Sequence, residues 1–456
     1  MTTTEPDATG TSNRYLSGVY APVSTEETIA DLPVEGTLPD HLDGRYLRNG
    51  PNPIGGVDPA TYHWFTGTGM VHGLRIRDGR AEWYRNRWVR SASVAAELGE
   101  PPHPGPINGD FDFSANTNII GHAGRTFAIV EAGSNPYELT DELDTIGPCD
   151  FDGTLGGGFS AHPHLDPTTG ELHTVSYYWA WGNKVRYSVL DPSAHITKLV
   201  DVETTGAPML HDCAVTASSV VIYDLPVVFD LDAAMAGANL PYRWADDYPA
   251  RIGLLPRDGQ GSDTQWFDID PCYVFHTLNA YDEGDTVVLD LVRHNRMFAT
   301  DFNGPNEGRP TLERWTLDRR AGTVRTAPLA EGGHEFPRID ERLFGTPHRY
   351  GYTVGIGNDT EGAVGVENTL YRHDATTGTS TSRTFGSGST VGEFVFVPNS
   401  PDAAEHDGVL MGFSHDAGTD TSRLEVVDAT TLDPVAAVQL PVRVPVGFHG
   451  NWIPTA

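Results

Sequence analysis

The chain has 456 residues, of which 38% are hydrophobic and 10% aromatic, so it can bury a substantial core and disorder over most of its length is excluded. Its 62 acidic and 30 basic residues give a net charge of −32, which excludes nucleic acid as a partner and electrostatic attachment to anionic lipid. The three cysteines are widely spaced, with no Cys-x-x-Cys pair, so neither a disulfide framework nor a structural zinc site is expected from them.

Residues 1–25 are expected to form a flexible N-terminal tail. Residues 1–13 are rich in Thr, Asp and Gly and have neither the basic nor the apolar region of a signal peptide. No run of about 18 apolar residues occurs in the chain, so no membrane-spanning helix is expected. We therefore expect a cytoplasmic protein, with peripheral membrane contact as an added option.

After the tail, turn signals recur at short intervals between alternating or β-branched segments. Asp78-Gly79 joins 74–77 to 80–84 and is typical of a type I′ hairpin turn. Turns of the form Asp-x-x-x-Gly recur at 166–170, 318–322 and 374–378.

Convincing helices are few and short, and the best candidates span 91–98 and 231–238. Many short strands without β-α-β alternation predict an all-β closed or radial architecture. No clean repeat marks the blades of a propeller, so the pattern alone leaves both forms open. No linker divides the chain, which predicts one domain over residues 26–456.

Most histidines in proteins are hydrogen-bonded structural or surface residues, so a histidine needs a reason to be singled out. Four of the 18 histidines lie between apolar or small residues and are expected to be buried: His162, His211, His276 and His449. They are far apart in the sequence, so four supersecondary units would each supply one, as at the axis of a propeller. Four neutral imidazoles would leave a divalent metal its full charge and open coordination positions, which suits an O2-activating iron better than closed zinc.

A series of motifs resembles, in the same order, those of the carotenoid cleavage oxygenase family. Examples are Arg48-Asn49-Gly50-Pro51, Leu210-His211-Asp212 and Gly447-Phe448-His449-Gly450. Further matches lie at 63–73, 115–118, 161–172, 275–281 and 335–339. The matches run from about residue 30 to the C-terminus, and together they are highly specific, although one alone would not be.

The resemblance implies a seven-bladed β-propeller with a dome of loops and short helices over the face that contains the metal. It implies one non-haem Fe(2+) per chain, held on the axis by the catalytic ligands His162, His211, His276 and His449. It also implies three glutamates that stand behind the ligands and accept the outer N–H of a histidine ring: Glu131 for His211, Glu335 for His276 and Glu393 for His449. The alternative for each glutamate is a solvated surface charge, which its apolar flanks argue against.

Two positions near these motifs need separate mention. After His162-Pro163 the family often has lysine, whereas this chain has His164. Residues i and i+2 of a strand share a face, so His164 competes with His162 as a ligand, and the Ser-Ala-His-Pro context favours His162. Thr117 matches a family position beside the iron, where a side-chain methyl group restricts one coordination position.

The resemblance implies cleavage of a carbon–carbon double bond by O2 to aldehyde or ketone products. One branch of the family cleaves carotenoids or apocarotenoids. Another cleaves stilbenes or isoeugenol-type phenylpropenes and holds the phenol with a lysine, where this chain has Val130. The only lysines, Lys184 and Lys198, lie outside the matching motifs. We therefore expect an apolar polyene substrate, with a phenolic substrate as the alternative.

Two other classes of protein are weighed against an oxygenase. A non-catalytic propeller that serves as a binding scaffold would need no buried set of histidines. A metal-dependent hydrolase would be expected to use carboxylate ligands and an activated water. The iron content of the pure protein would distinguish an oxygenase from a binding scaffold, and dependence of the reaction on O2 would distinguish it from a hydrolase.

Overall fold

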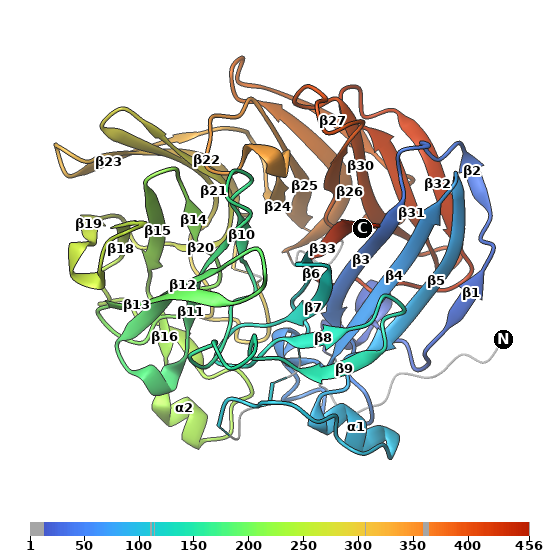
Figure 1. Ribbon diagram of the computed structural model, residues 1–456, viewed down its shortest axis with the longest axis horizontal. Coiled ribbons are helices and arrows are strands. Elements are labelled where there is room, and N and C mark those ends of the chain that lie inside the picture. Colours follow the sequence, from blue (N-terminus) through green and yellow to red (C-terminus); the bar gives the residue numbers. More distant parts are fainter. Residues whose placement is uncertain (1–12, 110–111, 114, 306, 359–363, 456) are drawn as a thin grey trace.

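The computed structural model describes residues 13–109, 112–113, 115–305, 307–358 and 364–455. Its strands form seven blades around a central axis, which confirms the seven-bladed β-propeller expected from the sequence motifs (Figure 1). All described pairs of neighbouring strands are antiparallel, and turns or longer loops connect successive strands within each blade.

The first four blades follow one another along the chain, and the strands of each are given in their order of pairing. Blade 1 contains β1 (Thr28–Ala30), β5 (Arg80–Trp88), β4 (Gly69–Arg77), β3 (Gly44–Pro51) and β33 (Gly450–Pro454). Blade 2 contains β6 (Asn118–His122), β7 (Arg125–Ile129), β8 (Tyr137–Leu139) and β9 (Thr145–Pro148). Blade 3 contains β10 (His164–Leu165), β11 (Leu172–Tyr177), β12 (Lys184–Leu190) and β13 (Ile196–Glu203). Blade 4 contains β14 (Ala214–Val215), β15 (Ser219–Asp224), β18 (Arg251–Pro256) and β19 (Gln265–Asp268).

The remaining three blades complete the ring. Blade 5 contains β20 (Tyr273–Glu283), β21 (Thr286–His294), β22 (Thr311–Asp318) and β23 (Thr323–Pro328). Blade 6 contains β24 (His334–Arg338), β25 (Tyr350–Asn358), β26 (Val364–Asp374) and β27 (Thr379–Thr384). In blade 7, β28 (Ser389–Val391) and β29 (Val395–Pro398) both pair with β30 (Gly408–Asp416), followed by β31 (Thr421–Asp428), β32 (Pro434–Leu440) and β2 (Val34–Gly36). A separate hairpin joins β16 (Val227–Phe229) to β17 (Tyr242–Trp244).

The two ends of the chain close the ring. The N-terminal strand β2 pairs with β32 of the last blade, and the C-terminal strand β33 pairs with β3 of the first. Blades 1 and 7 then share a hydrophobic core that includes Tyr46 and Met411. Pairing both ends leaves no open edge between the first and last blades, so the propeller is held shut by strand hydrogen bonds and by core packing.

Local sequence explains the turns and helices. Asp78 and Gly79 both have positive φ angles, 50° and 68°, as a type I′ turn between β4 and β5 requires. The expected helices form at α1 (Ala92–Leu98) and α2 (Leu231–Met235). The second ends earlier than expected because Gly237, with φ 84°, leaves the helical region.

A dome of loops covers one end of the ring, on the side where α1 and α2 lie in Figure 1. Short 3-10 turns at Arg14–Leu16, Gly18–Tyr20 and Trp64–Thr66 belong to it, with Tyr15 buried and stacked 4.9 Å from Trp64. Of the expected tail, residues 1–12 lie outside the described part, and the segment from Asn13 packs on the dome. Further 3-10 turns span Trp179–Trp181, Gly261–Asp263 and Glu341–Leu343. Among the described helices, none has the length and apolar character needed to cross a bilayer.

Candidate metal centre

Four histidines from four blades meet on the axis of the propeller. His162 and His211 lie just before β10 and β14, His276 lies in β20, and His449 directly precedes β33. Each of these strands stands at the edge of its blade nearest the axis (Figure 1). Their side chains therefore converge, although the residues are far apart in the sequence.

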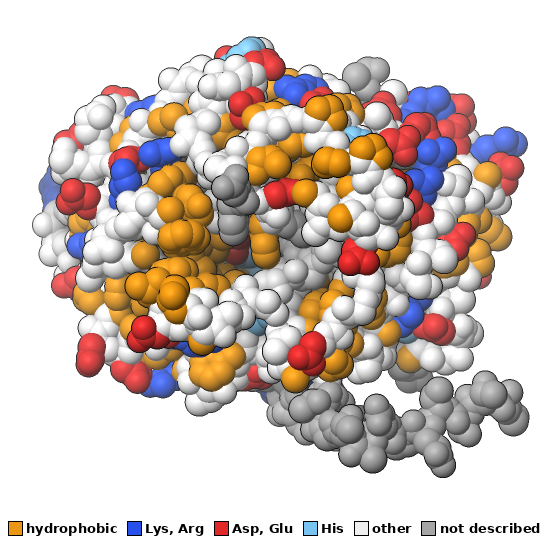
Figure 2. Space-filling model, turned by 90° about the horizontal axis from the view of Figure 1, so that it is seen from below, with side chains coloured by type: hydrophobic (Ala, Val, Ile, Leu, Met, Phe, Trp, Pro, Cys, Tyr) orange, Lys and Arg blue, Asp and Glu red, His pale blue; other side chains and the backbone are white. Residues whose placement is uncertain are grey.

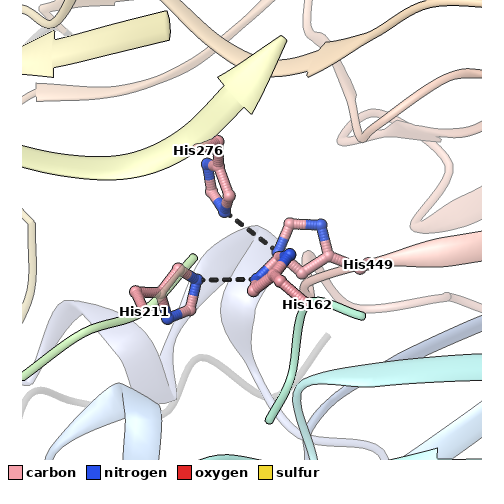
Figure 3. A group of neighbouring side chains, drawn as sticks. All are labelled: His162, His211, His276 and His449. Carbon is pink, nitrogen blue, oxygen red and sulfur yellow. Dashed lines mark hydrogen bonds between the residues drawn. The ribbon is translucent and has the colours of Figure 1, made fainter. Parts of the chain in front are cut away.

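The rings face one another through their Nε2 atoms (Figure 3). The Nε2 atoms of His162 and His211 are 2.9 Å apart, and those of His276 and His449 are 3.1 Å apart. All four side chains are buried, and one nitrogen from each lies within 4.8 Å of the others. For comparison, two nitrogens bound at right angles to one ion, each about 2.1 Å from it, are about 3.0 Å apart.

The outer nitrogens of three of the rings face carboxylates. Nδ1 of His276 lies 2.5 Å from Oε2 of Glu335, and Nδ1 of His449 lies 3.0 Å from Oε1 of Glu393. Because each Nδ1–H donates to a carboxylate, the neutral rings present lone pairs on Nε2. The Nε2 atoms of His276 and His449 are 3.1 Å apart, so their lone pairs repel each other unless a cation or a proton lies between them. The four rings therefore fit a divalent metal.

The third pair of histidine and glutamate, His211 with Glu131, has a less regular geometry. Nδ1 of His211 lies 2.7 Å from Oε2 of Glu131, but the contact is not aligned as a hydrogen bond. The other oxygen of Glu131 accepts a hydrogen bond of 3.1 Å from the hydroxyl of Tyr177. For His162, the described part of the chain places no carboxylate against the ring, so this histidine is held by its neighbours in the cluster.

Two residues without a sequence-based role support the buried glutamates. His294 places Nε2 2.8 Å from Oε1 of Glu335, so this carboxylate bridges two rings. Arg338 lies 3.5 Å from Glu393 and also donates to Asn451. Arg338 belongs to a motif that the sequence analysis quoted, whereas nothing around His294 in the sequence distinguishes it from a strand histidine.

These contacts explain how the charges can be buried. Burial would raise the pKa of Glu393, but Arg338 and His449 outweigh it and lower the pKa to about 2. Burial is likewise outweighed at Glu335, where His276 holds the pKa of the carboxyl well below its usual range. Burial lowers the pKa of His162 and of His449, which favours the neutral rings that bind metals. At His276 burial acts in the same direction, but Glu335 outweighs it and raises the pKa.

His164, the competing ligand, lies outside this cluster. Its Nε2 is 2.7 Å from Oδ1 of Asp212, and its ring packs 5.0 Å from that of Phe344. The strand β10 begins at His164, so the chain before it, at His162, is not bound by strand geometry and can turn toward the other three rings. The structure thus separates the two histidines that the sequence left in competition.

An apolar pocket of about 240 Å³ reaches the cluster from the dome side. His211, His276 and His449 lie at its inner end, together with Thr117 and Val130. Its walls are largely aromatic and include Trp64, Phe65, Trp179, Phe275, Phe336 and Phe448. Seen from this side, hydrophobic side chains gather around a hollow in the surface (Figure 2).

Thr117 and Phe336 illustrate how the inner end of the pocket is shaped. The hydroxyl of Thr117 donates to Oδ1 of Asn116 at 2.9 Å, so its polar atom is already engaged. Phe336 has a positive φ of 51° and stacks on His276 with 5.6 Å between ring centroids. That backbone conformation is unusual for a bulky residue and indicates that the ring is held in place against the histidine.

A second cavity, of about 560 Å³, reaches the same cluster from the opposite side. It is more polar than the first pocket, and its walls include Arg45, His122, Asp141, His164, Asp212 and Arg338. His162, His276 and His449 line its inner end. The histidine cluster therefore separates an apolar pocket under the dome from a polar cavity along the axis.

This propeller with a histidine cluster at its axis matches a known family. The family model described as Retinal pigment epithelial membrane protein matches residues 20–454. The chain belongs to that family, which includes the carotenoid cleavage oxygenases. This match confirms the resemblance seen in the sequence motifs.

Individual relatives support the same assignment. A protein of Mycobacterium tuberculosis named carotenoid cleavage oxygenase is 50% identical, with all of both chains covered. The isoeugenol monooxygenase of Pseudomonas putida is 30% identical, covering 96% of this chain and 97% of its own. Among solved structures, the lignostilbene dioxygenase of Pseudomonas brassicacearum has a TM-score of 0.87 and 28% identity, covering 97% of this chain and 98% of its own. A cobalt-substituted Synechocystis enzyme has a TM-score of 0.85 and 28% identity, and the match covers 95% of this chain and 97% of that enzyme.

Replacing the buried glutamates tests whether they orient the rings. Glu335→Gln and Glu393→Gln should each lower metal affinity or turnover by about 10–100-fold, because an amide holds the Nδ1–H less strongly than a carboxylate. Metal titration and steady-state turnover measure the effect, and thermal melting shows that the variants are folded. The control is Glu97→Gln, at an exposed position. Wild-type metal affinity and turnover in both variants would contradict the orienting role.

Proposed function

We propose that this protein is a non-haem Fe(2+)-dependent oxygenase that cleaves a carbon–carbon double bond of a carotenoid or apocarotenoid with O2, giving aldehyde or ketone products. The observation that supports it most directly is the convergence of four Nε2 atoms, three of them from rings that line the inner end of an apolar pocket. The names of the relatives, which include carotenoid cleavage oxygenases and dioxygenases, favour the same class of reaction.

The donor set favours Fe(2+), one ion per chain, with His162, His211, His276 and His449 as ligands. Imidazole is a suitable ligand for iron, and four neutral rings leave open positions where O2 can be activated. A hydrolytic metal site would be expected to use a carboxylate ligand, but the nearby carboxylates face the outer nitrogens of the rings. A binding scaffold would gain nothing from burying four rings and three carboxylates.

In this mechanism the iron would supply the activation of O2, and the chain supplies the surroundings. Glu335 and Glu393 keep the protons on Nδ1 of His276 and His449, and Glu131 faces Nδ1 of His211, so that the Nε2 atoms of these three rings are available as ligands. The methyl group of Thr117 would narrow the space beside the cluster, since its hydroxyl is bound elsewhere. The aromatic walls exclude water, which protects reactive species from side reactions.

The pocket favours an apolar polyene over a phenol. Binding of a polyene would gain about 25 cal/mol of free energy for each Å² of apolar surface removed from water. A phenol would need a buried partner, and its loss would cost about 1–3 kcal/mol, or about 5–150-fold in affinity. Val130 lines the pocket where phenol-cleaving relatives place lysine. The only lysines are engaged elsewhere, Lys184 with Asp201 and Lys198 with a backbone carbonyl.

One observation supports the alternative, a stilbene or isoeugenol-type substrate. Tyr242 lines the apolar pocket, and its buried hydroxyl has no hydrogen-bond partner among the described residues. Its ring packs edge-on against Tyr177, 5.7 Å away. A small movement could let the hydroxyl bind a phenol, and it could equally bind an oxygen at the end of an apocarotenoid. The relatives named lignostilbene dioxygenase and isoeugenol monooxygenase fit the first possibility.

Substituting the four histidines tests the metal assignment. Each His→Ala change at 162, 211, 276 or 449 should remove the tightly bound iron and abolish cleavage, because each would remove one ligand. Iron content, measured after anaerobic reconstitution, and O2 uptake are the readouts. His415→Ala is the matched control, since His415 is also buried but its ring faces Asp420. Cleavage by the wild type without O2 would instead indicate a hydrolase.

A substrate panel tests the preference for polyenes. The wild type, given an apocarotenal, a C40 carotenoid and a 4-hydroxystilbene, should cleave a polyene, with aldehydes identified by mass. Val130→Lys should lower polyene turnover at least tenfold, because it buries an amine in an apolar pocket. Val130→Met, of similar length but uncharged, is the control. Efficient cleavage of the stilbene without turnover of any polyene would reverse the assignment, and Tyr242→Phe would then be expected to weaken that activity.

The surface near the pocket favours uptake of substrate from a membrane. Trp179 lines the pocket, and α2 leads directly into Leu240 and Pro241, which also line it. We call four exposed hydrophobic residues on this side the rim: Trp179, Leu231, Met235 and Phe302. Leu231 is 63% and Met235 81% exposed, so both could enter the surface of a bilayer. With a net charge of −32, contact would rest on apolar burial rather than on anionic lipid.

Vesicle flotation tests the rim. The wild type should float with phosphatidylcholine vesicles, and the double variant Leu231→Glu/Met235→Glu should bind at least tenfold less, because full burial of each side chain is worth about 1.5–3 kcal/mol. Leu165→Glu is the control, since Leu165 is exposed beside the polar cavity. Equal binding of the three proteins, or none by the wild type, would exclude the rim as a membrane contact.

A further inference from the structure

We propose that the polar axial cavity contains a second divalent-metal site, built by His164, Asp212 and Cys213. Nε2 of His164 lies 2.7 Å from Oδ1 of Asp212. A ligand atom from each of the three residues lies within 4.8 Å of the others; Asp212 and Cys213 are buried, and the side chain of His164 is 11% exposed. The site is separate from the four-histidine cluster, so its existence does not depend on the proposed cleavage reaction.

The fold builds this triad from the same segments that supply two of the clustered histidines. His164 begins β10, two residues after His162, and Asp212 and Cys213 directly follow His211. The segments that lead into the edge strands of blades 3 and 4 therefore hold both groups. His164 and Asp212 line the polar cavity, so an ion can reach them from solvent on the side away from the dome.

The carboxylate of Asp212 pairs with His164 and not with a permanently charged lysine or arginine. Burial would lower the pKa of His164, but Asp212 outweighs it and raises that pKa, so an ion that binds here displaces the proton of His164. The backbone N–H of Cys213 donates to Oδ1 at 2.7 Å, and the N–H of Thr277 donates to Oδ2 at 2.8 Å. Among the described residues, neither lysine nor arginine forms an ion pair with Asp212, and its one side-chain partner is His164. A buried carboxylate with this surrounding is stabilised by a bound cation.

The three donors indicate which ions the site takes. A thiolate, an imidazole and a carboxylate suit Zn²⁺ or Fe²⁺, whereas Mg²⁺ and Ca²⁺ prefer oxygen ligands alone. Three protein ligands leave a fourth tetrahedral position, which a water from the cavity of about 560 Å³ can fill. The Cys213 thiol loses its proton to solvent as the ion binds, so the thiolate replaces the S–H as the donor.

The same residue types could instead form a cysteine nucleophile with a histidine base and an orienting carboxylate. Cys213 is 1% exposed, belongs to the largest hydrophobic core cluster and is not among the residues that line the cavity. Burial also raises the pKa of its thiol. A substrate cannot reach the sulfur, whereas an ion between the three side chains needs access only past His164 and Asp212.

Cobalt binding distinguishes the two sites in one experiment. The metal-free full chain is titrated with Co²⁺ while absorption is followed in the near ultraviolet, where a thiolate ligand gives a charge-transfer band and imidazole alone does not. The wild type should bind two ions per chain and develop the band. Cys213→Ser should bind one ion and show no band. Cys272→Ser, which removes another buried thiol, is the control and should keep the band.

His449→Ala separates this proposal from the proposed function, because it should abolish cleavage yet leave the thiolate band intact. X-ray absorption of the zinc-loaded wild type gives a measurement that needs no variant and should show sulfur at about 2.3 Å from zinc. The absence of that sulfur, a wild type without the band, or a band that survives Cys213→Ser would each overturn the second site. A wild type that binds two ions and loses the band with Cys213 would establish it.

Discussion

The closure of the propeller ring is the constraint on which the rest of the structure depends. β33 pairs with β3 and β2 pairs with β32, so the two ends of the chain hold the first and last blades together. His449 directly precedes β33 and reaches the axis only through this pairing. The other three clustered histidines come from blades 3, 4 and 5, so an open ring would leave them without the fourth. Closure therefore stabilises the fold and assembles the site in the same step.

Within the closed ring, the cost of burying charge is met by fixed hydrogen bonds. Glu335 lies between His276 and His294, and Glu393 is held by His449, Arg338 and the backbone N–H of Gly450. These contacts keep the carboxylates ionised and the outer nitrogens protonated. The cluster then separates an apolar pocket from a polar cavity, so an apolar substrate and water can approach the same centre from opposite sides.

Much of the fold could be predicted because its signals are local or are carried by motifs. The Asp78-Gly79 turn and α1 follow from residues next to one another, and the seven-bladed ring followed from the order of the motifs. The glutamates and their partners were implied by the resemblance to the family motifs, and the structure places each beside the histidine expected for it. His294 was missed because its contact with Glu335 crosses between strands of different blades and leaves no pattern in the sequence.

The sequence by itself determined the strand-and-turn character of the chain, the short helices and which residue types could bind a metal, because these depend on neighbouring residues and composition. The Ser-Ala-His-Pro context favoured His162 over His164, but only the tertiary structure shows where each of the two rings lies. One turns to three rings from other blades, and the other meets Asp212. The structure also brought Cys213 next to His164, a contact between two blades. Such choices depend on how blades are rotated about the axis, which no short stretch of sequence encodes.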